Sequence, residues 1–599
     1  MSCSVGQYDY NRYLLAVAGL GGLLYGVDVG IIGGALPYLE ATSHLNAGQL
    51  SIIVAAVLLG SVLSTLFTGL LSDWMGRKPL MVLSGLLFAV SVPVIALSHG
   101  YGPLFFGRLL QGISGGVIGV VVPLYLAECL AAQDRGKGTG IFQWLLTLGI
   151  VSAAVIGIYY SYRVEAVAGA ADAASLFHFK DQAWRRIFWL SLPPGALFAV
   201  GTLFVSESPR WLFQHGKKEL AHAALLRSRT PAQAAVEIQE MEQIAAAATS
   251  GPAAGNKAAD PLLRRRYVIP FLLACVILFC NTATGVNSII GYNTDILLQS
   301  GLSDVRAHWG YVVFTFVNFL MTIVGVVLVD RKGRKFLFLV GTSGIFVSLI
   351  CVGAMFLKTE KLNWDCRTEL QSMVTHDQAL TLRFNEEQAG RILSSAGYHG
   401  GRIRAARASL AVIYSYGSFT AAASIVRSDD PSALIQITRE SCVPASRIEA
   451  FFRNPVGNLE AARTAPLKIE RAYIGEVPGA GHGWLVAGGL YTFIAFYALG
   501  PGVCVWLALS ELMPTRIRSN GMSIALVINQ MVSTTLAAVF LPVVSKHGYS
   551  TMFFLFAGFT AVYLATVAFF LPETKGKTLE EIEEYFESGE GRVQPAREA

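Results

Sequence analysis

The sequence predicts an all-helical membrane protein in which twelve membrane-spanning helices form two six-helix halves. Composition is the first observation behind this fold class, because 53% of the 599 residues are hydrophobic and only 14% are charged, whereas soluble proteins carry about 25% charged residues. The second is a series of twelve apolar runs, each long enough to cross a bilayer. The third is an internal repeat, in which short motifs of the first half recur in the second.

The predicted spans follow one another along the chain with two long interruptions. They cover residues 12–40, 49–72, 79–99, 103–131, 138–161, 185–206, 267–299, 308–330, 336–357, 482–510, 519–546 and 549–571. The first interruption, 207–266, is charged and alanine-rich, which predicts short amphipathic helices. The second, 358–481, is a polar insertion large enough to be a small domain. We therefore expect one half at 1–206, the other at 267–357 with 482–571, and a tail at 572–599.

Lysine and arginine predict the orientation of the chain. Basic residues such as Arg77, Arg334 and Arg516 occupy short loops that share one side if both termini are cytoplasmic. The linker and tail are then cytoplasmic and the insertion is extracytoplasmic, in a multi-pass protein of the cell membrane (the inner membrane in a bacterium). Residues 408–426 are apolar enough to resemble a thirteenth span, but an odd number of crossings would place Arg334 and Arg516 on opposite faces. Because the basic residues lie in these loops, the net charge of +6 does not indicate a nucleic-acid partner.

The internal repeat supports the division into two halves. The paired motifs are Asp73-x-x-Gly76-Arg77-Lys78 with Asp330-x-x-Gly333-Arg334-Lys335, and Glu128 seven residues before Arg135 with Glu511 seven residues before Arg518. The first acid and the glutamate are 55 residues apart in the first half and 181 apart in the second. The excess is about the size of the polar insertion. Paired halves of this kind are how many secondary transporters build a central site with alternating access.

Asp28 is the main candidate for a functional residue, because nothing else between Tyr13 and Leu39 is charged. A carboxylate at bilayer depth costs several kcal/mol unless a partner or a water-filled cavity receives it. Glycines around it allow a neighbouring helix or a ligand to approach the backbone closely. Arg108 is the one arginine or lysine within the fourth predicted span, and is the candidate partner of Asp28.

The cysteines and acidic groups predict neither a metal site nor a cofactor. The eight cysteines are scattered without the spacing of metal ligands. Cys366 and Cys442 share the insertion and are candidates for a disulfide if that region is extracytoplasmic. The histidines and acids of the insertion have no spacing typical of a metal site or a catalytic triad, so we do not expect an enzyme.

Six motifs, in order along the chain, resemble those of the sugar porter family of the major facilitator superfamily. They are Gly76-Arg77-Lys78, Pro123-x-Tyr125-x-x-Glu128 with Arg135-Gly136, Glu207-Ser208-Pro209-Arg210, Gly333-Arg334-Lys335, Gly500-Pro501-Gly502 with Trp506 and Glu511, and Pro572-Glu573-Thr574. The resemblance covers nearly the whole chain apart from 358–481. It implies the major facilitator fold and transport of a sugar by alternating access, as in proton-coupled monosaccharide symporters and animal glucose facilitators.

The resemblance also implies a role for Asp28 and Arg108. Proton-coupled members carry a coupling pair at these two positions, whereas the animal facilitators tend to have a neutral residue in place of the aspartate. A carboxylate released from its arginine in an apolar setting favours its protonated form, and protonation then favours one state of the transporter over the other. The alternative is a static pair that fixes helix packing.

Amide side chains and one aromatic residue are implied to bind the substrate. The positions that match the family are Gln143, Asn287, Asn318, Trp506 and Asn529. Three further candidates are Asn281 and Thr282, where the family has two glutamines, and Tyr292, the aromatic retained from a pair. Amides suit a polyol because each offers donors and an acceptor to neighbouring hydroxyls. The alternative for any one of them is a hydrogen bond between helices, and the departures leave the identity of the sugar open.

Charged residues at the cytoplasmic helix ends of both halves are candidates for a gate. The set is Asp73, Arg77, Glu128, Arg135, Glu207, Arg210, Asp330, Arg334, Glu511 and Arg518. We expect ion pairs there to clamp the halves together when the site faces outward and to break when it opens inward. The alternative is orientation signalling and surface pairing, which contribute little individually.

The sequence therefore favours proton-coupled symport of a monosaccharide, with the sugar, protons and the lipid bilayer as partners. The nearest alternatives are a passive sugar facilitator and a transporter of polyols such as inositol. A sugar sensor that uses residues 358–481 to bind an extracytoplasmic partner is a further alternative, although the presence of both candidate gates argues against it.

Overall fold

The computed structural model describes residues 2–130, 135–168, 172–249, 264–398, 400, 403–447, 449–450, 454, 457–514, 517–575, 577 and 579–588. Within them, twelve helical segments are long and apolar enough to cross a membrane, and each overlaps one of the predicted spans. The first half contains α1 (Ser2–Thr42), α2 (Ala47–Met75), α3 (Arg77–Ala96), α4 (Tyr101–Cys129), α5 (Arg135–Ala168), α6 (Ala173–Trp189) and α7 (Leu192–Leu203). The second contains α11 (Arg265–Ala283), α12 (Val286–Gly291), α13 (Asn293–Gln299), α14 (Asp304–Lys332), α15 (Arg334–Glu360), α21 (Ala480–Leu499), α22 (Pro501–Leu512), α23 (Arg518–His547) and α24 (Tyr549–Phe569).

The sixth span begins earlier than predicted. Its helix α6 starts at Ala173, where the Asp172 side chain caps the helix by accepting a hydrogen bond from the Ser175 N–H at 3.2 Å. The charged residues of α6 lower its mean hydropathy and conceal its helical period from a search for apolar runs. Its apolar face, with Trp184 and Phe188, is nevertheless buried in the core of the membrane region.

Three spans are interrupted within the membrane region: the sixth, between α6 and α7, and two spans of the second half. The predicted span at 267–299 is three short helices, and its first break lies at Gly285, whose φ is +82°. A side chain at Gly285 would overlap the Phe556 ring, so the turn needs glycine both for its conformation and for space. The tenth span breaks between α21 and α22 at Gly500, directly before Pro501. Broken helices are where many transporters place their substrate sites.

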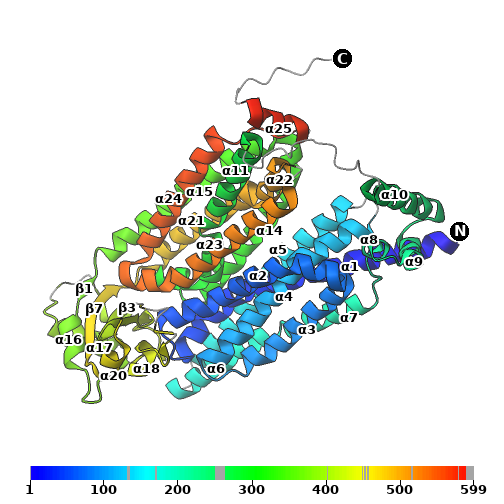
Figure 1. The fold of residues 1–599 in the computed structure, drawn as a ribbon. Helices are drawn as coiled ribbons and strands as arrows, with labels where there is room; N and C mark the ends of the chain where they lie inside the picture. Colours follow the sequence, from blue (N-terminus) through cyan, green and yellow to red (C-terminus); the bar gives the residue numbers. More distant parts are fainter. Residues whose placement is uncertain are drawn as a thin grey trace.

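Short helices lie outside the spans. Residues 207–249 form α8 (Pro209–Gln214), α9 (Lys218–Ser228) and α10 (Pro231–Thr249), and the chain after the last span forms α25 (Leu579–Ser588). In Figure 1 the two sets of spanning helices converge near the insertion and diverge toward α8–α10 and α25.

The insertion lies between the ninth and tenth spans and contains β structure. One sheet has five antiparallel strands, β1 (Trp364–Asp365), β3 (Ala408–Tyr416), β4 (Phe419–Ala422), β5 (Val426–Arg427) and β7 (Leu467–Glu476), in the order β1-β7-β3-β4 with β5 also paired to β3. A second sheet pairs β2 (Leu380–Arg383) with β6 (Leu434–Ile437). Short helices α16 (Arg367–Ser372), α17 (Glu386–Ser395), α18 (Arg439–Cys442) and α20 (Leu459–Thr464) pack around them. The helical membrane region with an insertion between the ninth and tenth spans is thus confirmed, and the insertion itself contains strands.

The apolar stretch 408–426 is a β-hairpin with one further short strand. Alternate residues of β3, including Leu410 and Val412, are buried in a separate hydrophobic core of the insertion. A strand that buries one face alternates in this way. Burial in a sheet therefore explains why the stretch resembled a thirteenth span.

The candidate disulfide is not formed. Cys366 carries a free, fully buried thiol at the start of α16, and its N–H bonds to Ala472 in β7. The thiol of Cys442 instead donates to the Phe419 carbonyl at 3.2 Å. Burial raises the pKa of the Cys366 thiol to about 12, which disfavours the thiolate that disulfide exchange requires.

The insertion contacts both halves of the membrane region. The Lys180 ammonium of α6, in the first half, donates to the Asp430 carboxylate at 2.8 and 2.9 Å and to the Ser432 hydroxyl at 2.6 Å. The Arg427 guanidinium donates to the carbonyls of Leu298 and Leu302, in the second half, at 2.6 and 3.0 Å. We call these two sets of contacts the insertion bridge.

Helices α2 and α23 run side by side across the boundary between the halves. Near the insertion they are joined by a hydrogen bond from the Leu541 N–H to the Ser51 hydroxyl at 3.1 Å. Toward the other end of α2, Leu70 and Trp74 are 73% and 75% exposed, and Ile524 of α23 is 49% exposed. The halves are therefore joined at the insertion end and uncovered at the other.

Candidate functional site

Asp28 lies in the middle of α1, and Arg108 lies on the neighbouring helix α4. Each of the two residues is only 1% exposed. The Asp28 Oδ1 atom is 3.8 Å from the Arg108 Nη1 atom. Neither carboxylate oxygen of Asp28 has a hydrogen-bond partner among the described residues. The structure thus places the two predicted residues together as a charge pair that is close enough for attraction but too long for a hydrogen bond.

The arginine of this pair is held by other groups. Its Nη1 atom donates to the side-chain amide oxygen of Gln111 (Oε1) at 2.7 Å, and its guanidinium lies 5.5 Å from the centre of the Phe188 ring. These contacts orient Arg108 independently of Asp28. Sequence reasoning did not include Gln111, although it lies three residues after Arg108 and so on the same helix face.

Glycine makes room for the carboxylate. A Cβ atom at Gly115 of α4 would lie 3.0 Å from Asp28 Oδ2 and 3.2 Å from the ring of Tyr25. Tyr25 lies one helical turn before Asp28, and its side chain is close to the polar side chains of Ser61 in α2 and Gln530 in α23. Asp28 therefore neighbours a tyrosine that reaches into the other half, a connection that the sequence did not indicate.

Several predicted substrate residues meet in the second half. The Asn281 amide donates to the Tyr497 hydroxyl at 3.2 Å, and the Thr282 hydroxyl donates to the Asn529 carbonyl at 3.0 Å. The Asn529 amide donates to the Leu278 carbonyl at 2.7 Å. The buried side-chain amide oxygen of Asn281 has no partner among the described residues, and so remains able to accept a hydrogen bond.

The remaining candidates are more widely placed. The Asn287 amide donates to the Ser533 hydroxyl at 2.7 Å. Gln143 is half-buried on α5, Asn318 is buried on α14, and Trp506 on α22 is 47% exposed. Tyr292 lies apart from them, because its hydroxyl donates to the Ala537 carbonyl at 3.0 Å and lies 3.2 Å from the Ser51 hydroxyl. It belongs to the joined end of the halves.

The joined end is built on the glycines of α1. The carbonyl of Gly30 accepts from the Tyr311 hydroxyl at 2.9 Å, and that of Gly33 accepts from the Thr294 hydroxyl at 2.6 Å. Tyr38 donates to the Asp304 carboxylate at 2.7 Å. A Cβ atom at Gly33 would lie 2.7 Å from the Tyr311 ring, so the missing side chain is what lets α14 approach. The sequence indicated close approach at these glycines but not the partner helices.

The candidate gate residues of the first half form a cluster around Arg77. Its guanidinium contacts Asp73 at 3.1 Å and Glu128 at 3.0 Å. Glu207 accepts from the Arg77 N–H at 3.0 Å, and Ser208 donates to Glu128. Arg210 is exposed.

The second half repeats this arrangement. Arg334 contacts Glu511 at 3.0 Å, Glu573 accepts from the Arg334 N–H at 3.0 Å, and Thr574 donates to Glu511 at 2.6 Å. Each of these ion pairs lies within one half. The expected clamp between the halves concerns the outward-facing state and stays a prediction. The side chains of Arg135, Asp330 and Arg518 lie outside the described residues.

Comparison with known proteins matches this arrangement to transporters. A family model described as "Sugar (and other) transporter" matches residues 14–369 and 471–586. The proton myo-inositol cotransporter of Homo sapiens is 27% identical over 585 residues, covering 96% of this chain and 82% of that protein. Glucose transporter GlcP of Staphylococcus epidermidis is 25% identical over 578 residues, covering 96% and 97%. The partially occluded inward open xylose transporter XylE from E. coli has a TM-score of 0.61 at 17% identity, covering 95% of this chain and all of that one.

Proposed function

Because the chain belongs to the sugar transporter family of the major facilitator superfamily, we propose that it moves a monosaccharide or polyol across the membrane together with a proton. The family transports sugars and is not enzymatic. Proton coupling is carried by one observation, the buried Asp28 that lies 3.8 Å from Arg108 without a hydrogen bond to it. A relative described as a proton myo-inositol cotransporter supports both the coupling and a polyol substrate.

The proposed coupling acts through charge compensation. An ionised Asp28 is stabilised by Arg108, and a proton on Asp28 removes that attraction. Arg108 keeps its place in either case, because Gln111 and Phe188 hold it. Tyr25 lies against the same glycine as Asp28, Gly115, and its side chain is close to Gln530 of the other half. Protonation of Asp28 therefore changes the electrostatic environment of Tyr25 at the boundary between the halves.

The substrate is proposed to lie between the two broken helices of the second half and α5. Asn281, Asn287 and Asn529 present amides there, and the exposed Trp506 provides an aromatic face. Gln143 and Asn318 complete the set from α5 and α14. Small-molecule sites combine a few polar groups with apolar walls in this way. We further propose cytoplasmic termini, an extracytoplasmic insertion, and the domain boundaries expected from the sequence.

The test is uphill transport in proteoliposomes. An imposed inward proton gradient, with equal sugar on both sides, is expected to drive accumulation by the wild type. Asp28→Asn should abolish accumulation while equilibrium exchange persists. The matched control is Asp172→Asn, because Asp172 is an exposed helix cap and asparagine caps equally well. Undiminished accumulation by Asp28→Asn would refute the coupling role.

A passive facilitator is the second candidate. The fixed position of Arg108 favours it, because an arginine already bonded to Gln111 suits a static packing role. A facilitator equilibrates sugar but does not accumulate it under the same proton gradient, so one experiment separates the two.

A further inference from the structure

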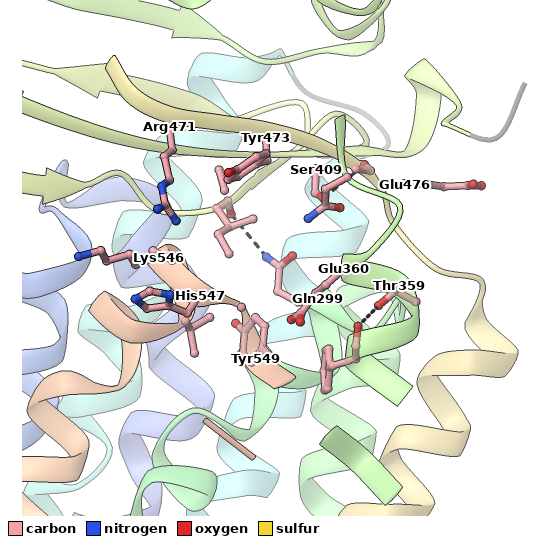
Figure 2. Close-up of a pocket in the computed structure, with 18 of the residues that line it drawn as sticks. Gln299, Thr359, Glu360, Ser409, Arg471, Tyr473, Glu476, Lys546, His547 and Tyr549 are labelled. Atoms are coloured by element: carbon pink, nitrogen blue, oxygen red, sulfur yellow. Dashed lines mark hydrogen bonds between the residues drawn. The ribbon is translucent and has the colours of Figure 1, made fainter. Parts of the chain in front are cut away.

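A cavity lies where the insertion meets the second half, away from the proposed sugar site (Figure 2). It has a volume of about 410 Å³, within the range of pockets that bind small molecules. Its roof is the five-stranded sheet, and its floor is the junction of α15, α23 and α24.

The sheet presents a polar face to this cavity. On β3, Ser409 and Ala411 line it, and on β7, Arg471 and Tyr473 line it. The pairing of β3 with β7 shifts register at Ile413, which is opposite Arg471. The residues on either side of this bulge, Leu467 and Ile469 before it and Ala472 and Ile474 after it, remain buried in the insertion core. A bulge re-aims side chains, and here it leaves Arg471 on the cavity side.

Positive charge collects on one wall. Arg471 points down from the sheet toward His547, which lies with Lys546 at the end of α23 (Figure 2). All three side chains are exposed, and none has an ion-pair partner among the described residues. Part of the basic charge at the end of α23 complements the helix dipole, but the dipole does not account for an arginine from the sheet above.

The two acids of the cavity, Glu360 and Glu476, are each engaged by groups outside its basic wall. Glu360 accepts from the Ser550 N–H at 3.2 Å and from the Ser550 hydroxyl, and so caps α24. Glu476 lies 3.9 Å from Arg404 and sits on the opposite side from Arg471 (Figure 2). Glu360 and Glu476 thus have hydrogen-bond or ion-pair partners, whereas the basic side chains of the cavity have no ion-pair partner among the described residues. The cavity therefore favours a negatively charged ligand.

We propose that this cavity binds a small anion that carries a phosphate or carboxylate group on a hydroxyl-bearing body. The anionic group lies against Arg471 and His547, with Lys546 at the edge of the same wall, in keeping with the strength of arginine bonds to such oxygens. The body lies toward Gln299, Ser409 and Tyr473, which offer amide and hydroxyl groups. A sugar phosphate has this chemistry, and so does the phosphate headgroup of a lipid with hydroxyls, since the floor is formed by the ends of spanning helices. The site is separate from the proposed transport site and does not depend on proton coupling.

The first test measures binding of glucose 6-phosphate to the full-length protein in phosphatidylcholine nanodiscs by calorimetry. Arg471→Gln should weaken binding about tenfold or more, as expected for the loss of one charge-assisted hydrogen bond. Arg383→Gln is the matched control, because Arg383 is an exposed arginine on β2 of the same insertion that does not line the cavity. Excess neutral glucose should leave the affinity for the anion unchanged.

The second test places the protein in phosphatidylglycerol nanodiscs without soluble anion. A rise in melting temperature over phosphatidylcholine that Arg471→Gln abolishes assigns the anionic group to a lipid, whereas binding of glucose 6-phosphate in the first test assigns it to a soluble ligand. The proposal is overturned if Arg471→Gln and Arg383→Gln behave alike in both tests. Displacement of the anion by glucose also overturns it, because the anion would then occupy the sugar site.

Discussion

Replacing Lys180 with glutamine should favour the state in which the halves open at the insertion end. Lys180 is almost fully buried and makes three hydrogen bonds to the insertion, two to Asp430 and one to Ser432. Hydrogen bonds to charged groups contribute about 1.5–3 kcal/mol each when buried. The Asp430 side chain is 34% exposed, so water replaces much of what is lost. We therefore expect a loss of about 1–2 kcal/mol, or roughly 5- to 30-fold in the equilibrium.

The assay follows alkylation of a cysteine in the joined end. Thr294 is fully buried there, and Thr294→Cys serves as the common background so that its own lost hydrogen bond cancels. Modification of this peptide, followed by mass spectrometry, should be 5- to 30-fold faster with Lys180→Gln, in line with the estimate above. Lys218→Gln is the control, because Lys218 forms an exposed ion pair with Glu242. Equal rates in the two variants would refute the role of the insertion bridge.

The ion pair between Lys180 and Asp430 has a predictable response to pH. Burial alone would raise the pKa of Asp430, but the Lys180 ammonium and the Ser432 hydrogen bonds outweigh burial and hold the pKa below its usual value. A carboxyl whose pKa is lower in the closed state than in the open state stabilises the closed state at any pH above its ordinary pKa. The contribution of the bridge should therefore be constant near neutral pH and disappear only as the pH falls through the lowered pKa. Alkylation that accelerates between pH 8 and 6 would contradict this.

Two further predictions concern packing and charge. Arg77→Ala should lower the melting temperature more than Arg334→Ala, because it leaves Glu128 buried without its cation. The side chains of Arg77 and Glu128 are 6% and 10% exposed, whereas those of Arg334 and Glu511 are 15% and 23% exposed. Equal melting temperatures of the two variants would contradict this. Gly33→Ala should slow transport and speed alkylation at the joined end, because its Cβ atom would lie 2.7 Å from the Tyr311 ring. Adding Tyr311→Ala should restore closure, and a double variant that is alkylated as fast as Gly33→Ala would contradict this.

The sequence indicates the spans because each must be apolar along nearly its whole length. It singles out Asp28 and Arg108 for a related reason, since isolated charges stand out in such runs. The start of α6 was missed because an amphipathic helix with four charged residues between Lys180 and Arg186 resembles a loop in average hydropathy. The β-hairpin at 408–426 resembled a span because a buried strand pair is as apolar as a membrane helix.

The contacts between the halves could not be derived from the sequence. Gly30 and Gly33 are the visible part of that interface, since small residues indicate close approach. Their partners Thr294 and Tyr311 lie more than 250 residues away and carry no distinguishing motif. Which polar groups meet depends on how the two helical bundles are oriented relative to each other. That orientation changes during alternating access.

Apolar side chains at the ends of α2 and α23 away from the insertion are exposed, so we expect transport to depend on the surrounding lipid. Leu70 and Trp74 of α2 present apolar surface beside the diverging end of the neighbouring half. Acyl chains solvate leucine and tryptophan about as well as another helix does, so no hydrophobic driving force closes this seam. Each turnover therefore exchanges lipid tails for side chains, and tail length and unsaturation should set how readily that exchange occurs.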